Sequence, residues 1–134
     1  MSELAEKDAI REVMAEYCFR LDNERFAEMA ALFTADGTWD TAFGKGTGHA
    51  GIEALVRRIR GPGPTPRAIH HVTNIVIRLE GETATCFSNW VTVQNSPTGP
   101  KIGSAGSYSD DMVKQDGIWR FRCRKIDRFI HDKA

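Results

Sequence analysis

A six-residue stretch, GPGPTP at positions 61–66, divides the chain into two parts with different sequence patterns. Three of its residues are proline, which fixes its own φ and lacks the N–H that a helix or an inner strand needs, so the stretch interrupts regular structure. Before it, apolar residues recur with helical spacing, and after it come long segments rich in β-branched residues. Helices first and strands afterwards is the order typical of the α+β class.

The part before this stretch predicts three helices. In the first, apolar side chains recur at i, i+3 and i+4 from Ile10 to Leu21. The segment ERFAEMAALF (24–33) predicts a short second helix, with Asp22 or Asn23 as its N-cap. A turn-rich stretch then holds one brief strand at 38–43, and HAGIEALVRRIR (49–60) predicts the third helix.

Four β segments follow, at 68–80, 83–95, 102–115 and 118–130. The short glycine turns EGE and QDG between them are typical of hairpins and favour antiparallel order. We therefore expect a single α+β domain over residues 1–134, a cone in which three N-terminal helices pack on one face of a strongly curved, mainly antiparallel sheet. Such an arrangement encloses a pocket, the usual place for a small ligand.

Composition narrows the function classes. The 18 Lys and Arg residues balance 18 Asp and Glu residues, so net charge gives no reason to expect nucleic acid or a membrane as partner. The cysteines, Cys18, Cys86 and Cys123, lie singly without the spacing of a zinc site, which predicts free thiols in a reducing compartment. The acidic, helical N-terminus lacks a signal-peptide pattern, and we expect a cytoplasmic protein.

Two adjacent histidines open the first long strand, PRAIHHVTNIVI (66–77). Successive side chains of a strand point to opposite faces. Alternation thus puts His70 with Val72, Asn74 and Val76 on one face, and His71 with Thr73, Ile75 and Ile77 on the other. Both faces are largely apolar, so alternation alone leaves open which histidine is directed inwards.

Four blocks of the sequence resemble the SnoaL-like branch of the NTF2-like superfamily. They are AIREVMAEYCFRLDNERFAEMAALFTADGTWD, GTGHAGIEALVRRI, IHHVTN and GIWRFRCRKI, and their order and spacing fit the family over nearly the whole chain. In local pattern they are similar to enzymes of the scytalone dehydratase, bile-acid dehydratase and hexachlorocyclohexane dehydrochlorinase types. The resemblance implies acid–base chemistry without metal or organic cofactor: dehydratase-like elimination, or cyclisation or isomerisation of a polyketide- or terpenoid-like hydrophobic substrate.

The resemblance also implies the site residues. The aspartate after the first helix and the histidine on the next long strand, here Asp22 and His70, form a general-base dyad, which directs His70 inwards and His71 outwards. Tyr17, five residues before Asp22, would hydrogen-bond a substrate oxygen or a leaving group. The expected substrate-binding set is Asn74, Trp39, Phe43, Phe26, Trp90 and Arg124.

These residues also have ordinary structural interpretations. Asp22 could cap a helix, Tyr17 could belong to the core, His70 could be structural and Asn74 could satisfy backbone groups beside a bulge. Simple alternation places Arg124 with the outward-facing arginines of its strand, opposite the apolar set. Only a β-bulge or an oligomer interface would turn it into the pocket.

A non-catalytic function also stays open, because fold does not fix function. The superfamily includes small subunits of ring-hydroxylating dioxygenases and simple ligand-binding modules, although this chain lacks extra segments for wrapping a partner. We further expect a homodimer or a higher homo-oligomer. Either the convex face that carries His71, Thr73 and Ile75 or the tryptophan face of the last strand is too apolar for water.

Overall fold

The computed structural model of the chain describes residues 2–64 and 66–132, which form three helices and six strands. The helices are α1 (Glu3–Asp22), α2 (Phe26–Ala30) and α3 (Gly48–Arg60). The strands are β1 (Phe33–Thr41), β2 (Gly44–Thr47), β3 (Ala68–Glu80), β4 (Thr83–Ser96), β5 (Gly99–Gln115) and β6 (Ile118–His131).

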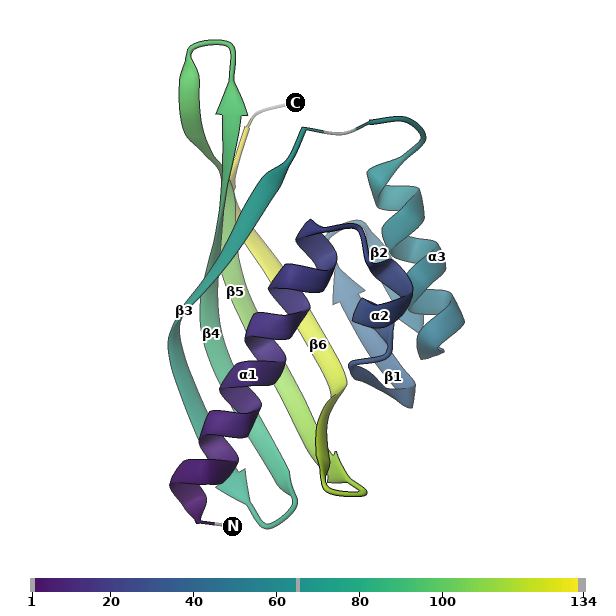
Figure 1. Ribbon diagram of the computed structural model, residues 1–134, viewed down its shortest axis with the longest axis vertical. Helices are drawn as coiled ribbons and strands as arrows, with labels where there is room; N and C mark the ends of the chain where they lie inside the picture. The colour runs from purple at the N-terminus through teal and green to yellow at the C-terminus, as the bar shows by residue number, and fades with distance from the viewer. Residues whose placement is uncertain (1, 65, 133–134) are drawn as a thin grey trace.

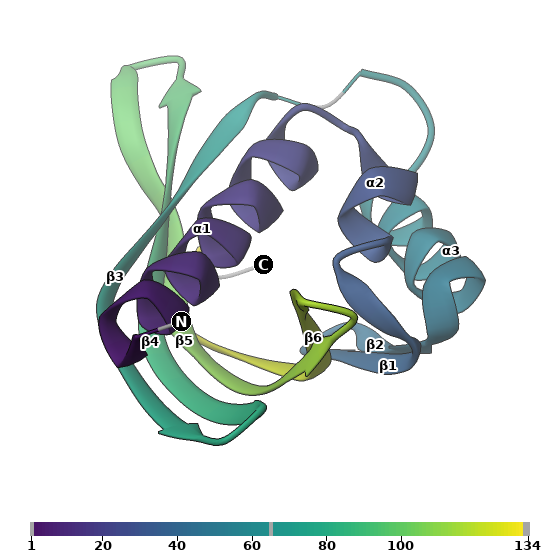
Figure 2. The same cartoon turned by 60° about the horizontal axis from the view of Figure 1, so that its bottom comes forward.

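The strands form one sheet in the order β2-β1-β6-β5-β4-β3, in which β1 runs parallel to β6 and all other neighbours are antiparallel. Figure 1 shows α1 lying across the inside of the sheet, with α2 and α3 beside β1 and β2. Figure 2 shows the long strands curling around α1. The α+β cone with a curved, mainly antiparallel sheet is therefore confirmed.

Helix α1 supplies much of the core, as its apolar spacing predicts. Its buried side chains are Ile10, Met14, Tyr17, Cys18 and Leu21. They follow one face of the helix and pack against the concave side of the sheet. The helix begins at an N-cap serine, whose hydroxyl accepts a hydrogen bond from the backbone N–H of Ala5 at 3.1 Å. Helix α1 packs against β3 and ends at Asp22, which places this residue beside that strand.

The region between α1 and α3 differs from the sequence expectation. Instead of one brief strand at 38–43, it forms the hairpin of β1 and β2. Gly46 allows β2 to lie against α3, since a Cβ there would come within 2.9 Å of the carbonyl oxygen of Gly51. Helix α2 is shorter than expected and its N-cap is Arg25; Asp22 instead ends α1, and Asn23 is the C-cap of α1.

A β-bulge in β3 corrects the expected alternation. Thr73 pairs with Asn89 and Val76 with Phe87, so Asn74 and Ile75 together face one residue of β4. Asn74 has φ of 54°, a left-handed conformation that asparagine tolerates better than most residues. Beyond the bulge the faces exchange: Asn74 is exposed, whereas Ile75 packs against the core.

Candidate active site

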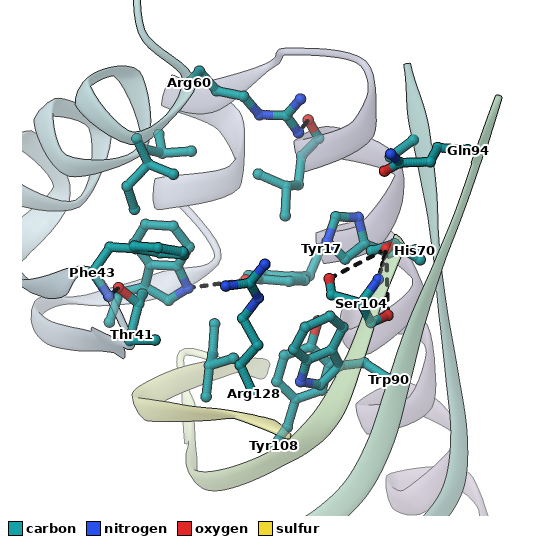
Figure 3. Close-up of a pocket in the computed structure, with 18 of the residues that line it drawn as sticks. Tyr17, Thr41, Phe43, Arg60, His70, Trp90, Gln94, Ser104, Tyr108 and Arg128 are labelled. Carbon is teal, nitrogen blue, oxygen red and sulfur yellow. Dashed lines mark hydrogen bonds between the residues drawn. The ribbon is translucent and has the colours of Figure 1, made fainter. Parts of the chain in front are cut away.

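A cavity of about 300 Å³ lies between α1, α3 and the concave face of the sheet. Figure 3 shows side chains from α1, β3, β4, β5 and β6 pointing into it. Its walls combine apolar groups, among them Leu21, Val56 and Ile126, with the rings of Trp39 and Trp90. This volume falls at the lower end of the range usual for small-molecule sites.

Asp22 and His70 meet at this cavity. Asp22 Oδ1 lies 2.5 Å from His70 Nδ1, and Asp22 Oδ2 accepts a hydrogen bond from the backbone N–H of His70 at 2.8 Å. The carboxylate therefore holds both the ring and the main chain of His70. The two side chains are only 8% and 16% exposed, respectively, so little water competes for this contact. Asp22 is consequently not a helix cap.

The contact with Asp22 determines which of the two ring nitrogens of His70 carries the proton. A carboxylate accepts only, so Nδ1 carries the proton in the neutral ring and Nε2 keeps its lone pair. Within the described part of the chain, Nε2 has no hydrogen-bond partner, and His70 lines the cavity. The neighbouring His71 is exposed on the outer face. The inward direction of His70 and the outward direction of His71 thus agree with the sequence expectation.

Tyr17 is fully buried and forms part of the cavity wall, next to Trp39. Its hydroxyl oxygen accepts a hydrogen bond from Trp39 Nε1 at 2.9 Å. Burial raises the pKa of Tyr17 to about 12, so the hydroxyl is neutral at physiological pH and still has a proton to donate. Both residues belong to the cavity wall, so this hydroxyl lies close to the space that a ligand would occupy.

Trp90 forms the wall beside His70. The ring centroids of these two residues are 6.1 Å apart, and Trp90 stacks on Tyr108 at a centroid distance of 6.0 Å. The indole Nε1 of Trp90 donates to the backbone carbonyl of Asp127 at 3.2 Å, which fixes the ring plane. The expected wall residues Trp39, Phe43 and Trp90 all line the cavity.

Two expected substrate-binding residues lie elsewhere. Asn74 is exposed and donates to Asn89 Oδ1 at 2.9 Å, because the bulge turns it outwards. Phe26 is buried but does not belong to the residues described as lining this cavity; its ring packs beneath the guanidinium groups of Arg57 and Arg60. Within the described structure, neither residue lines this cavity: the expected place of Asn74 on the inner face with His70 is wrong, and substrate binding by Phe26 stays a prediction.

Arg124 is directed inwards, contrary to simple alternation. Arg122 has no partner on β5, since Phe121 pairs with Met112 and Cys123 with Asp111. This second bulge moves the residues that follow it, up to a further register shift at Phe129, to the opposite face, so that Arg124, Ile126 and Arg128 are directed inwards. Arg124 is fully buried and does not line the cavity in the described structure, so its assignment to substrate binding stays a prediction without a direct contact to this cavity.

The partner of Arg124 is Asp110, directly opposite on β5. Two parallel hydrogen bonds join them, from Nε to Oδ1 at 2.8 Å and from Nη2 to Oδ2 at 3.0 Å. Burial alone would lower the pKa of Arg124, but the facing Asp110 carboxylate raises it above its ordinary value. The guanidinium carbon lies 4.3 Å from the ring centroid of Tyr17 and 3.6 Å from that of Tyr108. The guanidinium of this ion pair therefore packs against the rings of both Tyr17 and Tyr108.

Several cavity residues were not expected from the sequence. They are Arg60, Thr92, Gln94, Ser104, Tyr108 and Arg128. Alternation counted back from Met112 places Tyr108 and Asp110 on the inner face, a signal that could have identified both. Arg128 offers no such signal, because it reaches the inner face only through the bulge at Arg122.

The sequence of this chain matches the model of the SnoaL-like domain family over residues 2–125. The chain therefore belongs to the SnoaL-like family. No curated protein sequence matches it. Over the described residues, no helix is both long and apolar enough to span a membrane.

Solved structures similar to this chain share its NTF2-like, cystatin-like fold. A candidate scytalone dehydratase from Novosphingobium aromaticivorans DSM 12444 is 27% identical, with TM-score 0.80 over 98% of this chain and 91% of its own. A variant of Rv3472, a protein of unknown function from Mycobacterium tuberculosis, is 25% identical, with TM-score 0.84 over 95% and 73%. The β subunit of a candidate aromatic-ring-hydroxylating dioxygenase from N. aromaticivorans is 22% identical, with TM-score 0.82 over 98% and 95%, a likeness of fold alone.

Proposed function

We propose that this protein is a cofactor-independent acid–base enzyme that removes a proton from a carbon of a hydrophobic small molecule. The reaction is an elimination of the dehydratase type, or a cyclisation or isomerisation begun by the same proton abstraction. The single observation that carries the proposal is the contact between Asp22 and His70 at the wall of an apolar cavity, with His70 Nε2 left available.

The proposed reaction begins at His70. Nε2 takes the proton from an activated C–H, and the ring becomes an imidazolium that Asp22 stabilises at Nδ1. Electron density moves from the broken C–H bond toward an adjacent carbonyl carbon, and charge develops on the carbonyl oxygen. The neutral Tyr17 hydroxyl is suited to donate to that oxygen or to a leaving hydroxyl. The imidazolium then returns its proton to the leaving group or to another carbon, which restores the neutral dyad.

Hydrogen exchange of a carbon acid tests the dyad without knowledge of the natural substrate. β-Tetralone is a bicyclic ketone with acidic C–H groups, and in D₂O its exchange is followed by proton NMR. Wild-type protein is expected to accelerate exchange, and His70→Ala to lose about 10²- to 10⁴-fold of that acceleration. Asp22→Asn should lose a comparable amount, and the double variant little more, because the two residues act as one unit.

His71→Ala is the matched control, since it removes the same side chain one residue further on, at an exposed position. Circular dichroism of each variant establishes that it is folded. Full exchange activity in folded His70→Ala, or equal losses in the His70 and His71 variants, would contradict the proposal. Full activity in Asp22→Asn alone would leave His70 as a base without a carboxylate partner.

A further inference from the structure

The charges that line the cavity all have one sign. Among the described lining residues, Arg60 and Arg128 carry guanidinium groups, and none carries a carboxylate. Asp22 contacts the lining residue His70 through both of its carboxylate oxygens, so it is not available to pair with these arginines. A cavity with apolar walls and two cations is mismatched to a purely hydrocarbon ligand, because guanidinium groups lose hydration when such a ligand enters.

Arg128 is the less occupied of the two arginines. It lies on β6 beyond the bulge and is half-buried, with its guanidinium carbon 5.4 Å from the ring centroid of Phe43. Over residues 2–64 and 66–132 it has no hydrogen-bond or ion-pair partner. Asp132, further along the chain, is bound by Lys101 Nζ at 2.8 Å instead. Figure 3 shows Arg128 rising between Phe43 and Thr41 on one side and His70 and Trp90 on the other.

Arg60, by contrast, is partly held by the protein. One of its guanidinium nitrogens donates to the backbone carbonyl of Leu21 at 3.4 Å, and its guanidinium carbon lies 5.9 Å from the ring centroid of Phe26. It comes from α3 rather than from the sheet. Arg60 therefore adds positive potential to the cavity, whereas Arg128 has donors available for a ligand.

We infer that the cavity takes an aromatic carboxylate, with the carboxylate bound by Arg128 and the ring between the indoles of Trp39 and Trp90. A guanidinium offers two parallel N–H donors that match the two oxygens of a carboxylate. The flat indole walls suit a fused-ring body, and a volume of about 300 Å³ suits a ligand of that size. The inference rests on the proposed function for its reaction and names the substrate class: a fused-ring carboxylic acid that also carries an activated C–H next to a carbonyl group, placed at His70.

Calorimetric titration with a matched pair of probes tests this inference. The probes are β-naphthoate and β-naphthamide, which have the same ring system and differ in charge. Wild-type protein is expected to bind the naphthoate more tightly by about tenfold or more, the effect of a charge-assisted hydrogen bond. Arg128→Gln should remove most of that preference while leaving naphthamide binding nearly unchanged.

Arg122→Gln is the control variant, because Arg122 lies on the same strand and is exposed. It should keep the preference for the anion. The inference is overturned if wild-type protein binds both probes equally or binds the naphthoate at no measurable level, or if Arg128→Gln keeps the preference. If Arg60→Gln loses the preference and Arg128→Gln keeps it, the carboxylate binds at Arg60 and the inference is overturned.

His70→Ala separates this inference from the proposed function. The variant should still prefer β-naphthoate to β-naphthamide, since Arg128 and the indole walls are unchanged. If His70→Ala keeps full exchange activity, the dyad fails while the anion site stands on the binding data. If the preference is absent but His70→Ala loses exchange activity, the dyad stands and the anion site fails.

Discussion

At the scale of single residues, the hydroxyl of Tyr17 has both a structural role and a role in the proposed reaction. It accepts the indole N–H of Trp39 inside the core, and its own proton is free for a ligand. Its ring also lies against the buried guanidinium of Arg124. Removing the hydroxyl therefore removes the acceptor of one buried donor as well as a donor to the cavity.

Tyr17→Phe is expected to lower β-tetralone exchange and to destabilise the fold by about 1 to 3 kcal/mol, because the Trp39 N–H is left unpaired. Urea unfolding measures the stability and NMR the exchange rate. Trp39→Phe removes the other partner of the same bond, and the double variant should lose less stability than the sum of the two single changes. Additive losses would show that the two groups are not coupled.

At the scale of elements, the bulge in β6 allows Arg124 to form a buried ion pair with Asp110 of the neighbouring strand β5. Asp110 and Arg124 are fully enclosed, and Arg124 Nη1 has no hydrogen-bond partner in the described structure. The rings of Tyr17, Tyr108 and Phe121 surround that guanidinium instead. Such a pair costs desolvation when it forms and costs more when one partner is removed.

Arg124→Met is expected to cost about 3 to 5 kcal/mol of unfolding free energy, because Asp110 is left as a buried charge without a counterion. The double variant Arg124→Met with Asp110→Leu should recover most of that loss, since neither charge remains. Denaturant titration of the wild type, both single variants and the double variant closes the cycle. A double variant less stable than either single variant would mean that the pair is needed for folding beyond its charges.

At the scale of the whole molecule, the outer face of β3 and β4 exposes apolar side chains in register. Ile69 pairs with Val93 and Val76 with Phe87, and all four are exposed, between 38% and 49%. Ile75, expected on this face, packs against the core, and Trp119 is buried within the chain. The tryptophan face is therefore closed, and the outer face of β3 and β4 offers an apolar surface to a second copy of this chain.

We expect a homodimer through this outer face at micromolar concentration, measured by sedimentation equilibrium. Phe87→Lys should shift the protein to monomer, because it places a charge on the apolar surface. Phe19→Lys is the control, since Phe19 is a similarly exposed aromatic residue on α1, outside that surface. A monomeric wild type would rule out the dimer, and dissociation by both variants alike would argue against this particular face.

The residue patterns of the sequence were enough for the fold class and the helix order, whereas the inward direction of His70 and the site roles of Asp22 and Tyr17 came from the family resemblance. Helical spacing and strand alternation are local properties, so they can be seen in one chain without its partners. The resemblance to the SnoaL-like branch then joined Asp22 to His70 across 48 positions of sequence, a link that local spacing cannot supply.

Tertiary structure alone decided the faces of Asn74, Arg124 and Arg128. Each lies at or beyond a bulge, and a single extra residue exchanges the two faces of everything that follows. Whether a bulge forms depends on the register with the neighbouring strand. In β3, Asn74 and Ile75 together face the single residue Ser88 of β4. In β6, Arg122 has no partner on β5. Register is a property of two strands together, and for that reason the alternation within one strand could not place these side chains.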